Sequence, residues 1–249
     1  MKKLPYQQIA SKTLKTMVLS RNGKISPHIP ETKWYNYEQL KQMLHRHSAV
    51  FIKPDKGGGG AGTVRVTKLG SRKVELHTLN SRKVIDARKL PFYLKSFLNP
   101  RRHYIIQQWI DLGKINGRPF DLRVHLQKPL SSWQISGVCA KIAAPGKIVT
   151  NHCKGGQPVE APKALYQVAA QKKQTIFLMR KIYNLSKEVA KTLNVFFPGL
   201  RELGIDLGVD KKLGIWIFEV NTRPDFKMFR VLEDLHMYDR IRKTHRFIV

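Results

Sequence analysis

Apolar residues at helical spacing open the chain. In residues 6–48 they recur every three or four positions in two stretches, 9–18 and 37–44. This spacing predicts two helices, with the first ending at Asn22-Gly23. The prolines within residues 27–30 favour an extended connector between them, because proline restricts the backbone.

Alternation of apolar and polar residues replaces helical spacing after residue 48. A period of two is typical of strands, and it predicts strands over residues 50–53, 63–67, 73–77, 104–110, 120–126, 134–143, 147–151, 203–209 and 215–221. Residues 86–98 are predicted to be helical or irregular. The turn at residues 210–214 joins the last two strands into a hairpin.

Helical spacing returns in the C-terminal part of the chain. From residue 163 an apolar stripe that includes Ile176, Ile182 and Leu193 predicts one long amphipathic helix, and residues 226–242 are predicted to be helical as well. Strands mixed with helices, without a regular βαβ rhythm, favour an α+β fold over a doubly wound sheet.

Composition excludes several classes of protein. Apolar residues make up 42% of the 249 residues, which excludes a disordered basic tail. No run of 18 apolar residues occurs, and the charged start is followed by no apolar stretch, so neither a membrane span nor a secretory signal is expected. The two cysteines lack CxxC spacing, which argues against a disulfide scaffold or a thiolate zinc site and favours a reducing, cytoplasmic location.

The charge is strongly positive, with 46 Lys and Arg against 17 Asp and Glu, a net charge of +29. Such a surplus attracts polyanions of any kind. The basic residues are spread along the chain, and no zinc-finger or RNP-type motif accompanies them. Nucleic acid is therefore not expected as the primary partner, and the simplest interpretation is a generally cationic surface.

A glycine-rich loop joins the first two predicted strands of the 49–110 region. The segment 51–64 reads FIKPDKGGGGAGTV, so a strand ends at Lys53 and a loop containing Lys56 follows. Glycines let backbone N–H groups approach phosphate oxygens, and a lysine adds a point charge. The Walker A ending is absent, which indicates a flap over phosphates. A flexible hairpin loop is the alternative.

Acidic and amide side chains lie together on the C-terminal hairpin. Glu219 and Asn221 are two residues apart and share a strand face, and the short turn brings Asp206 nearly opposite. Two carboxylates and an amide oxygen form a hard-oxygen site suited to Mg²⁺. Solvated positions, or acids paired with Lys or Arg, are the alternative.

Two further groups of residues are candidates for chemistry. Asp121 and Arg123 share one strand face, where Arg123 could hold a transferring phosphate or could form an ordinary ion pair. Asn151 begins the segment NHCKGG, which follows the strand carrying Lys141 and is either a tight backbone approach to a ligand or a plain turn.

These segments, in this order, resemble the ATP-grasp superfamily and, within it, the YheC/YheD group of endospore coat-associated proteins. The resemblance rests on ordered motifs that cover nearly the whole chain: HIPET at 28–32, FIKP at 51–54 with its glycine loop, QQWI at 107–110, FDLRV at 120–124, VTN at 149–151 with Gly155-Gly156, IDL at 205–207 and FEVNTRP at 218–224.

The resemblance implies two α+β lobes that grip ATP between them. It divides the chain into an N-terminal helical segment and connector (1–48), a small lobe with the flap (49–110) and a large lobe with the metal site (111–249). It implies Mg²⁺ ligands at Asp206, Glu219 and Asn221, and catalytic roles near the phosphates or the acceptor for Arg123, Lys141 and Arg223. It implies nucleotide contacts at Lys53, Lys56, Gly57, Gly58, Gly59, Gly60, Gln107, Gln108, Trp109, Ile110, Asp121 and Asn151.

The expected activity is ATP-dependent joining of a carboxylate to an amine through an acyl-phosphate. Only 48 residues precede the first strand of the predicted small lobe, so the acceptor is expected to come from outside, as an acidic small molecule, peptide or polymer. The resemblance leaves open a second function, that of a nucleotide-binding spore coat protein with little or no catalysis. Lys141 stands where many relatives carry arginine, and it cannot make arginine's bidentate contact.

Overall fold

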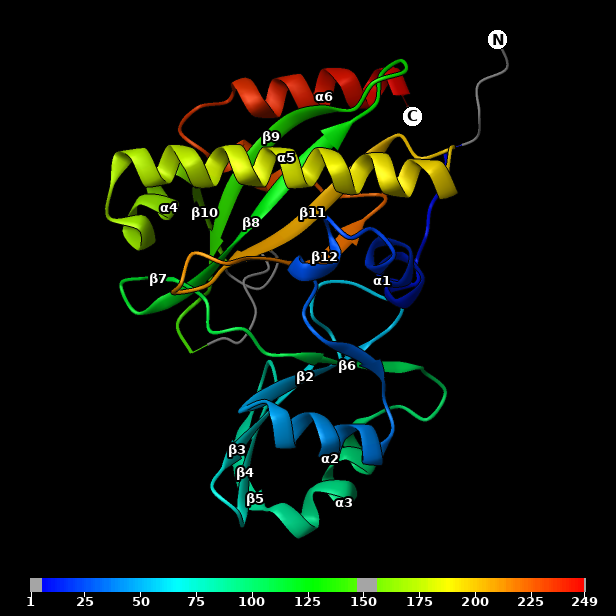
Figure 1. Cartoon of the computed structure of the whole chain (residues 1–249), viewed down its shortest axis with the longest axis vertical. Helices are drawn as coiled ribbons and strands as arrows, with labels where there is room; N and C mark the ends of the chain where they lie inside the picture. The colour runs from blue at the N-terminus through cyan, green and yellow to red at the C-terminus, as the bar shows by residue number, and fades with distance from the viewer. Residues whose placement is uncertain (1–5, 147–155, 249) are drawn as a thin grey trace.

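The computed structural model describes residues 6–146 and 156–248. It contains two lobes, each built on an antiparallel sheet with helices packed against it (Figure 1). The chain crosses between the lobes more than once, and its N- and C-terminal segments both lie with the larger lobe. Helices and antiparallel sheets together confirm the α+β prediction.

The small lobe is a six-stranded sheet in the order β1-β6-β2-β3-β4-β5. Its core contains Leu40, Met43, Val50 and Ile106, all fully buried. The elements of this lobe are β1 (Thr32–Trp34), α2 (Tyr37–Arg46), β2 (Ala49–Pro54), β3 (Val64–Leu69), β4 (Lys73–His77), β5 (Arg82–Asp86), η2 (Ala87–Lys89), α3 (Leu90–Phe97) and β6 (Tyr104–Gln108).

The large lobe is built on strands in the order β10-β9-β8-β11-β12, with β7 paired to β8. Its elements are α1 (Lys12–Ser20), η1 (Ser26–His28), β7 (Lys114–Ile115), β8 (Arg118–Gln127), β9 (Gln134–Ile142), β10 (Gln157–Glu160), α4 (Ala161–Ala169), α5 (Lys172–Phe196), β11 (Glu202–Val209), β12 (Ile215–Asn221), η4 (Lys227–Val231) and α6 (His236–Ile248).

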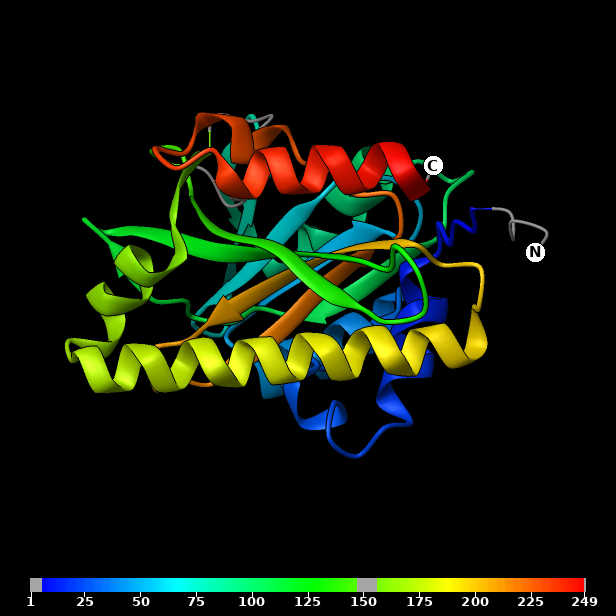
Figure 2. The ribbon, with the colours of Figure 1, turned by 90° about the horizontal axis from the view of Figure 1, so that it is seen from above.

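The central strand β8 is buried along both faces. Phe120, Leu122, Val124 and Leu126 point into the main core with α5, as the alternation along this strand predicts. The opposite face is shared: α6 and η4 cover its C-terminal part, while its N-terminal part faces the small lobe. In Figure 2, α5 and α6 lie on opposite sides of this sheet.

The N-terminal segment predicted over residues 1–48 is divided between the lobes. Val18, Leu19 and Ile25 join the large-lobe core, whereas Leu40 and Met43 join the small-lobe core. Helix α1 lies against α5 and β12. Residues from the start of the chain are therefore placed at the junction of the two lobes.

Several predicted elements differ from the observed ones. The single helix predicted from residue 163 is two helices, because Ala170 adopts a left-handed conformation at φ 54° and ends α4. The last helix begins at His236, where the Asp234 side chain accepts the His236 N–H; residues 227–231 form a 3-10 turn. The short strands β1, β5, β7 and β10 were not predicted, and residues 147–151 lie outside the described part.

Within residues 6–146 and 156–248, no helix is both long and apolar enough to cross a bilayer.

Candidate nucleotide and metal site

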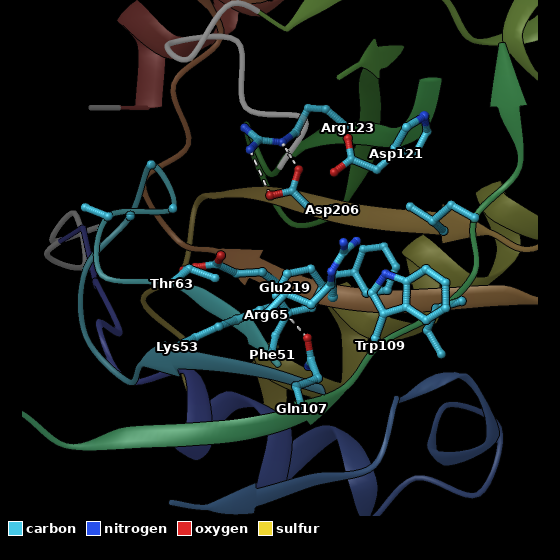
Figure 3. A pocket seen from close by; sticks show the side chains of 18 of the residues that line it. Phe51, Lys53, Thr63, Arg65, Gln107, Trp109, Asp121, Arg123, Asp206 and Glu219 are labelled. Carbon is cyan, nitrogen blue, oxygen red and sulfur yellow. Dashed lines mark hydrogen bonds and ion pairs between the residues drawn. The ribbon is translucent and has the colours of Figure 1, made fainter. Parts of the chain in front are cut away.

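A cleft of about 740 Å³ lies between the two lobes. It is lined from one side by the small-lobe strands β2, β3 and β6 and from the other by β8, β11 and β12 of the large lobe (Figure 3). A cavity of this size falls within the range of small-molecule and cofactor sites.

Lys53 forms part of the floor of the cleft, at the end of β2. Its Nζ donates to Oε1 of Gln107 at 2.7 Å and lies 5.0 Å from the centre of the Phe51 ring. Burial lowers the pKa of Lys53 to about 8, although the nearby Glu219 carboxylate favours its charged form. This amine has no carboxylate within ion-pairing distance among the described residues, so a bound anion would be its natural partner.

The glycine loop follows directly and lines the same cleft through Gly57, Gly58, Gly59 and Gly60. Gly57, Gly59 and Gly60 have φ values of 117°, 68° and 74°, which only glycine adopts readily. Lys56 is exposed and is not among the residues that line the cleft.

Lys12, at the start of α1, connects the large lobe to this loop through a hydrogen bond. Its Nζ donates to the carbonyl of Gly57 at 2.5 Å and lies 3.4 Å from Oε1 of Glu219. The Asp55 carboxylate accepts the backbone N–H and the hydroxyl of Thr13, both at 2.8 Å. The loop is therefore anchored to α1 at its base.

The segment between the lobes carries the predicted hinge. The Gln108 side chain accepts the N–H of Glu31 at 3.2 Å, which fixes the connection to β1. Gln107 lies directly beside Phe51 in the sheet and bonds Lys53 and Thr32. Trp109 and Ile110 follow and line the cleft at its other end.

The C-terminal hairpin brings Asp206, Glu219 and Asn221 together, as its register predicted. Asp206 and Glu219 are directly paired across β11 and β12. A bulge follows this pair, and Phe218 is the extra residue. Asn221 donates to Oδ2 of Asp206 at 3.3 Å. All three residues line the cleft.

Asp206 is held by two cations from neighbouring strands. Arg123 donates through Nε and Nη2 to the two carboxylate oxygens at 2.9 and 3.1 Å, and Lys141 Nζ lies 2.7 Å from Oδ1. Burial alone would raise the pKa of Asp206, but Arg123 and Lys141 outweigh burial and hold the pKa well below its usual range. This carboxylate is ionised at any ordinary pH.

Lys141 lies beneath Asp206, away from the open cleft. Its side chain is 1% exposed, and it also pairs with Asp121 at 3.1 Å. Arg123 uses its remaining terminal nitrogen to donate to the carbonyl of Asp225 at 3.1 Å. Both cations therefore form a network under the carboxylates, and Asp121 and Arg123 reach the cleft wall.

The donor set suits a hard divalent cation. Carboxylate and amide oxygens are the ligands that Mg²⁺ accepts. Lys12 lies beside Glu219 and Lys141 lies beneath Asp206, so each carboxylate already has a cationic partner. In the described part of the chain, no group of three or more His, Cys, Asp or Glu side chains could hold a metal. A metal here would therefore need the amide oxygen of Asn221, which at present turns its nitrogen to Asp206.

The sequence interpretation missed several cleft residues. Lys12 is one of them. It is a cation in the first turn of a helix, where the helix dipole disfavours positive charge, and this unfavourable position could have indicated a functional role. Arg65, His77 and Arg118 also line the cleft. Among the predicted residues, Arg223 lines the cleft after β12, whereas Asn151 lies outside the described residues.

Comparison with known proteins gives a family. A family model described as YheC/D like ATP-grasp matches residues 5–245. The endospore coat-associated proteins YheD and YheC of Bacillus subtilis (strain 168) are 26% and 24% identical, over 92% and 84% of this chain. The chain spans 51% and 58% of their lengths, so about half of these curated relatives.

Solved ATP-grasp structures share the fold. The D-cycloserine synthetase DcsG matches with a TM-score of 0.57 at 12% identity, over 96% of this chain and 70% of its own. The ATP-grasp ligase PsnB, complexed with a minimal precursor, matches with a TM-score of 0.53 at 13% identity, over 95% of this chain and 60% of its own. N5-carboxyaminoimidazole ribonucleotide synthetase from Thermotoga maritima matches with a TM-score of 0.51 at 14% identity, over 95% of this chain and 49% of its own. These similarities confirm the predicted fold.

Proposed function

Because the chain belongs to the YheC/D-like ATP-grasp family, we propose that it is an ATP- and Mg²⁺-dependent ligase that joins a carboxylate to an amine. One observation carries the proposal. The cleft places Asp206, Glu219 and Asn221 opposite Lys53 and the glycine loop. An oxygen-donor set facing an amine and a flap is what a metal-bound triphosphate requires.

The proposed reaction has two steps. A carboxylate oxygen of the acceptor attacks the γ-phosphorus, the bond to the β-phosphate oxygen breaks, and ADP leaves. The amine then attacks the acyl carbon and expels phosphate, and the amine loses a proton to solvent. The Mg²⁺ ion, held by Asp206, Glu219 and Asn221, would neutralise phosphate charge during the first step.

The chain's own residues position the reactants. Lys53 and Lys12 would bind phosphate oxygens, and the loop from Gly57 to Gly60 would close over them and exclude water. Arg123 would hold Asp206 in place and steady the transferring group. Lys141 would act through Asp206, since it is buried beneath that carboxylate.

The acceptor is proposed to be acidic, in the form of a small molecule, peptide or polymer. Arg223 and Lys227 line the end of the cleft that follows β12, and no ion pair engages either side chain among the described residues. The net charge of +29 would draw an anionic acceptor toward this opening. One of the structural relatives is described as bound to a precursor peptide and AMPPNP.

A second function has its own observation. Both oxygens of Asp206 are engaged by Arg123, Lys141 and Asn221. An aspartate so fully bonded suits a structural role, as in a nucleotide-binding coat-associated protein that catalyses little. The two curated relatives are both named as endospore coat-associated.

Measurement of ADP release separates the two functions. The protein is incubated with Mg-ATP and either an extract fraction or a panel of acidic peptides with free amines. A ligase releases ADP and phosphate only when acceptor is present, and Glu219→Gln abolishes the release. Glu233→Gln is the matched control, because Glu233 is 83% exposed and lies outside the cleft.

Thermal stability supplies the deciding readout. Mg-ATP should raise the Tm, because a ligand that binds the folded state stabilises it. Stabilisation without ADP release, for every acceptor tried, would favour the coat-associated function. The absence of both effects would rule out a nucleotide site and with it the ligase proposal.

A further inference from the structure

Four side chains form a row across the cleft face of the small sheet. Phe51 is paired with Gln107 on one side and with Arg65 on the other, and Arg65 is paired with His77. All four residues line the cleft. Lys53 lies two residues along β2 from Phe51, so the row is displaced by about 7 Å from the lysine toward the hinge.

Arg65 is the unexpected member of this row. Its side chain is 22% exposed. Its Nη2 lies 3.3 Å from Oε1 of Glu75 and 3.3 Å from Nδ1 of His77. Its Nε is buried and has no hydrogen-bond partner in the described part of the protein. A buried N–H without a partner is unfavourable unless a ligand completes it.

The guanidinium shares its space with the hinge tryptophan. The Arg65 Cζ atom lies 5.9 Å from the centre of the Trp109 ring, and Figure 3 shows Arg65 reaching toward Trp109 across the middle of the cleft. A planar guanidinium stacks on aromatic faces, which a lysine ammonium does not.

We propose that Arg65 and Trp109 together bind the nucleobase, with the guanidinium against the face of the base and its unpaired Nε–H, which lies in the guanidinium plane, directed to a ribose oxygen beside the base. This inference rests on the proposed function, since it locates a contact within the same nucleotide site. Glu75 and His77 are positioning residues, because they hold the guanidinium in the row.

The position of Arg65 favours the base over the phosphates. Lys53, Lys12 and the glycine loop gather at the far end of the cleft, next to Glu219. Arg65 lies one row nearer the hinge, beside aromatic side chains. With the phosphates bound at the loop, the base reaches the space between Arg65, Phe51 and Trp109.

Calorimetric titration with a series of ligands tests this assignment. The full chain, with Mg²⁺, is titrated with ATP, ADP, AMP and inorganic tripolyphosphate, which has no base. Arg65→Ala should lower the affinity for ATP, ADP and AMP by the same factor, about tenfold. The affinity for tripolyphosphate should stay unchanged. Arg65→Lys should behave like Arg65→Ala, because a lysine retains charge without a stacking plane. The lysine in this variant also keeps a cation beside Glu75. The Arg65→Lys variant therefore controls for misfolding caused by the loss of that ion pair.

Arg82→Ala is the matched control. Arg82 donates to the same Glu75 carboxylate at 2.6 Å, but its side chain is 68% exposed and outside the cleft, so all four affinities should be retained. A loss that grows from AMP to ATP, or rescue by Arg65→Lys, would make Arg65 a phosphate ligand and overturn the inference. Unchanged nucleotide affinity would overturn it too. If the unmodified protein binds no nucleotide, the proposed function fails first.

Discussion

Gly204 gives Arg123 the room it needs to reach Asp206. A Cβ atom at Gly204 would lie 3.1 Å from Nη1 and 3.3 Å from Cδ of Arg123. The same Cβ would lie 2.6 Å from Cβ of Pro224, in the segment that follows Asn221. The arginine that holds the acidic site therefore comes from β8 and lies across a position on β11 that has no side chain.

Replacement of this glycine should disturb the acidic site. Gly204→Ala forces either Pro224 or the Arg123 guanidinium to move, and it should destabilise the protein by about 1–3 kcal/mol and lower the affinity for Mg-ATP. Urea unfolding and calorimetric titration measure the two effects. Gly23→Ala is the control, because a Cβ there would meet nothing within 4 Å; equal behaviour of the two variants would contradict the packing argument.

Removal of the Asp206 charge should be costly even without nucleotide. Asp206→Asn would leave Arg123 and Lys141 buried with Asp121 as the main counter-charge. Buried cations that lose their partner typically destabilise a fold by about 3–5 kcal/mol. Urea unfolding in the absence of Mg-ATP measures this, with the exposed Asp239→Asn as reference. A loss below about 1 kcal/mol would show that the network is hydrated and dispensable.

Nucleotide binding should take up a proton near pH 8.5. Burial lowers the pKa of Lys53 to about 8 in the free protein, so the amine is largely neutral above that pH. A bound phosphate stabilises the charged form and raises the pKa. Affinity for ATP should therefore fall as the pH rises above 8, and the binding enthalpy at pH 8.5 should depend on the ionisation enthalpy of the buffer.

Two variants identify the group responsible for proton uptake. Lys53→Arg should bind ATP without buffer dependence, because arginine stays charged. Burial also lowers the pKa of Lys15 to about 8, but its Nζ bonds the carbonyl of Ile9 at 2.6 Å, outside the main cleft. Lys15→Arg should keep the buffer dependence. The opposite pattern would assign the proton to Lys15.

Helix α6 should depend on a buried carboxylate at the other end of β11. Glu202 is fully buried and accepts from Gln127 at 2.6 Å and Tyr6 at 3.2 Å, while Nδ1 of His245 on α6 lies 2.9 Å from it. Burial by itself raises the pKa of Glu202, but the nearby His125 ring, 3.6 Å from Oε1, and the hydrogen bonds from Gln127 and His245 lower it below the usual value.

The sign of the pH effect follows from that shift. A carboxyl group with a depressed pKa stabilises the fold above its unfolded pKa of about 4.3 and loses this contribution as the pH falls through the folded value. Glu202→Gln should therefore destabilise the protein by about 1–3 kcal/mol at neutral pH and flatten the acid side of the stability profile. Hydrogen exchange should show α6 losing protection first. An unchanged acid profile, with Glu233→Gln as control, would contradict this role.

Much of the site could be predicted because its geometry is local. The turn between β11 and β12 is short, so Asp206, Glu219 and Asn221 had to meet on one face. The glycine loop after Lys53 and the alternation along β8 are local features as well. Short edge strands such as β1 and β5 were not predicted, because a few residues carry too little periodicity, and Ala170 gave no sign that it would end a helix.

The amino-acid pattern predicts which side chains share a strand face and which segments form hairpins, since the two-residue repeat and the turn length fix both. Which cations reach those faces depends instead on the three-dimensional packing. Lys12 and Arg65 line the cleft and Lys141 lies beneath Asp206, and the three come from segments far apart in the chain. Their positions depend on the strand order within each sheet and on the packing of one lobe against the other. No local pattern of residues encodes that packing.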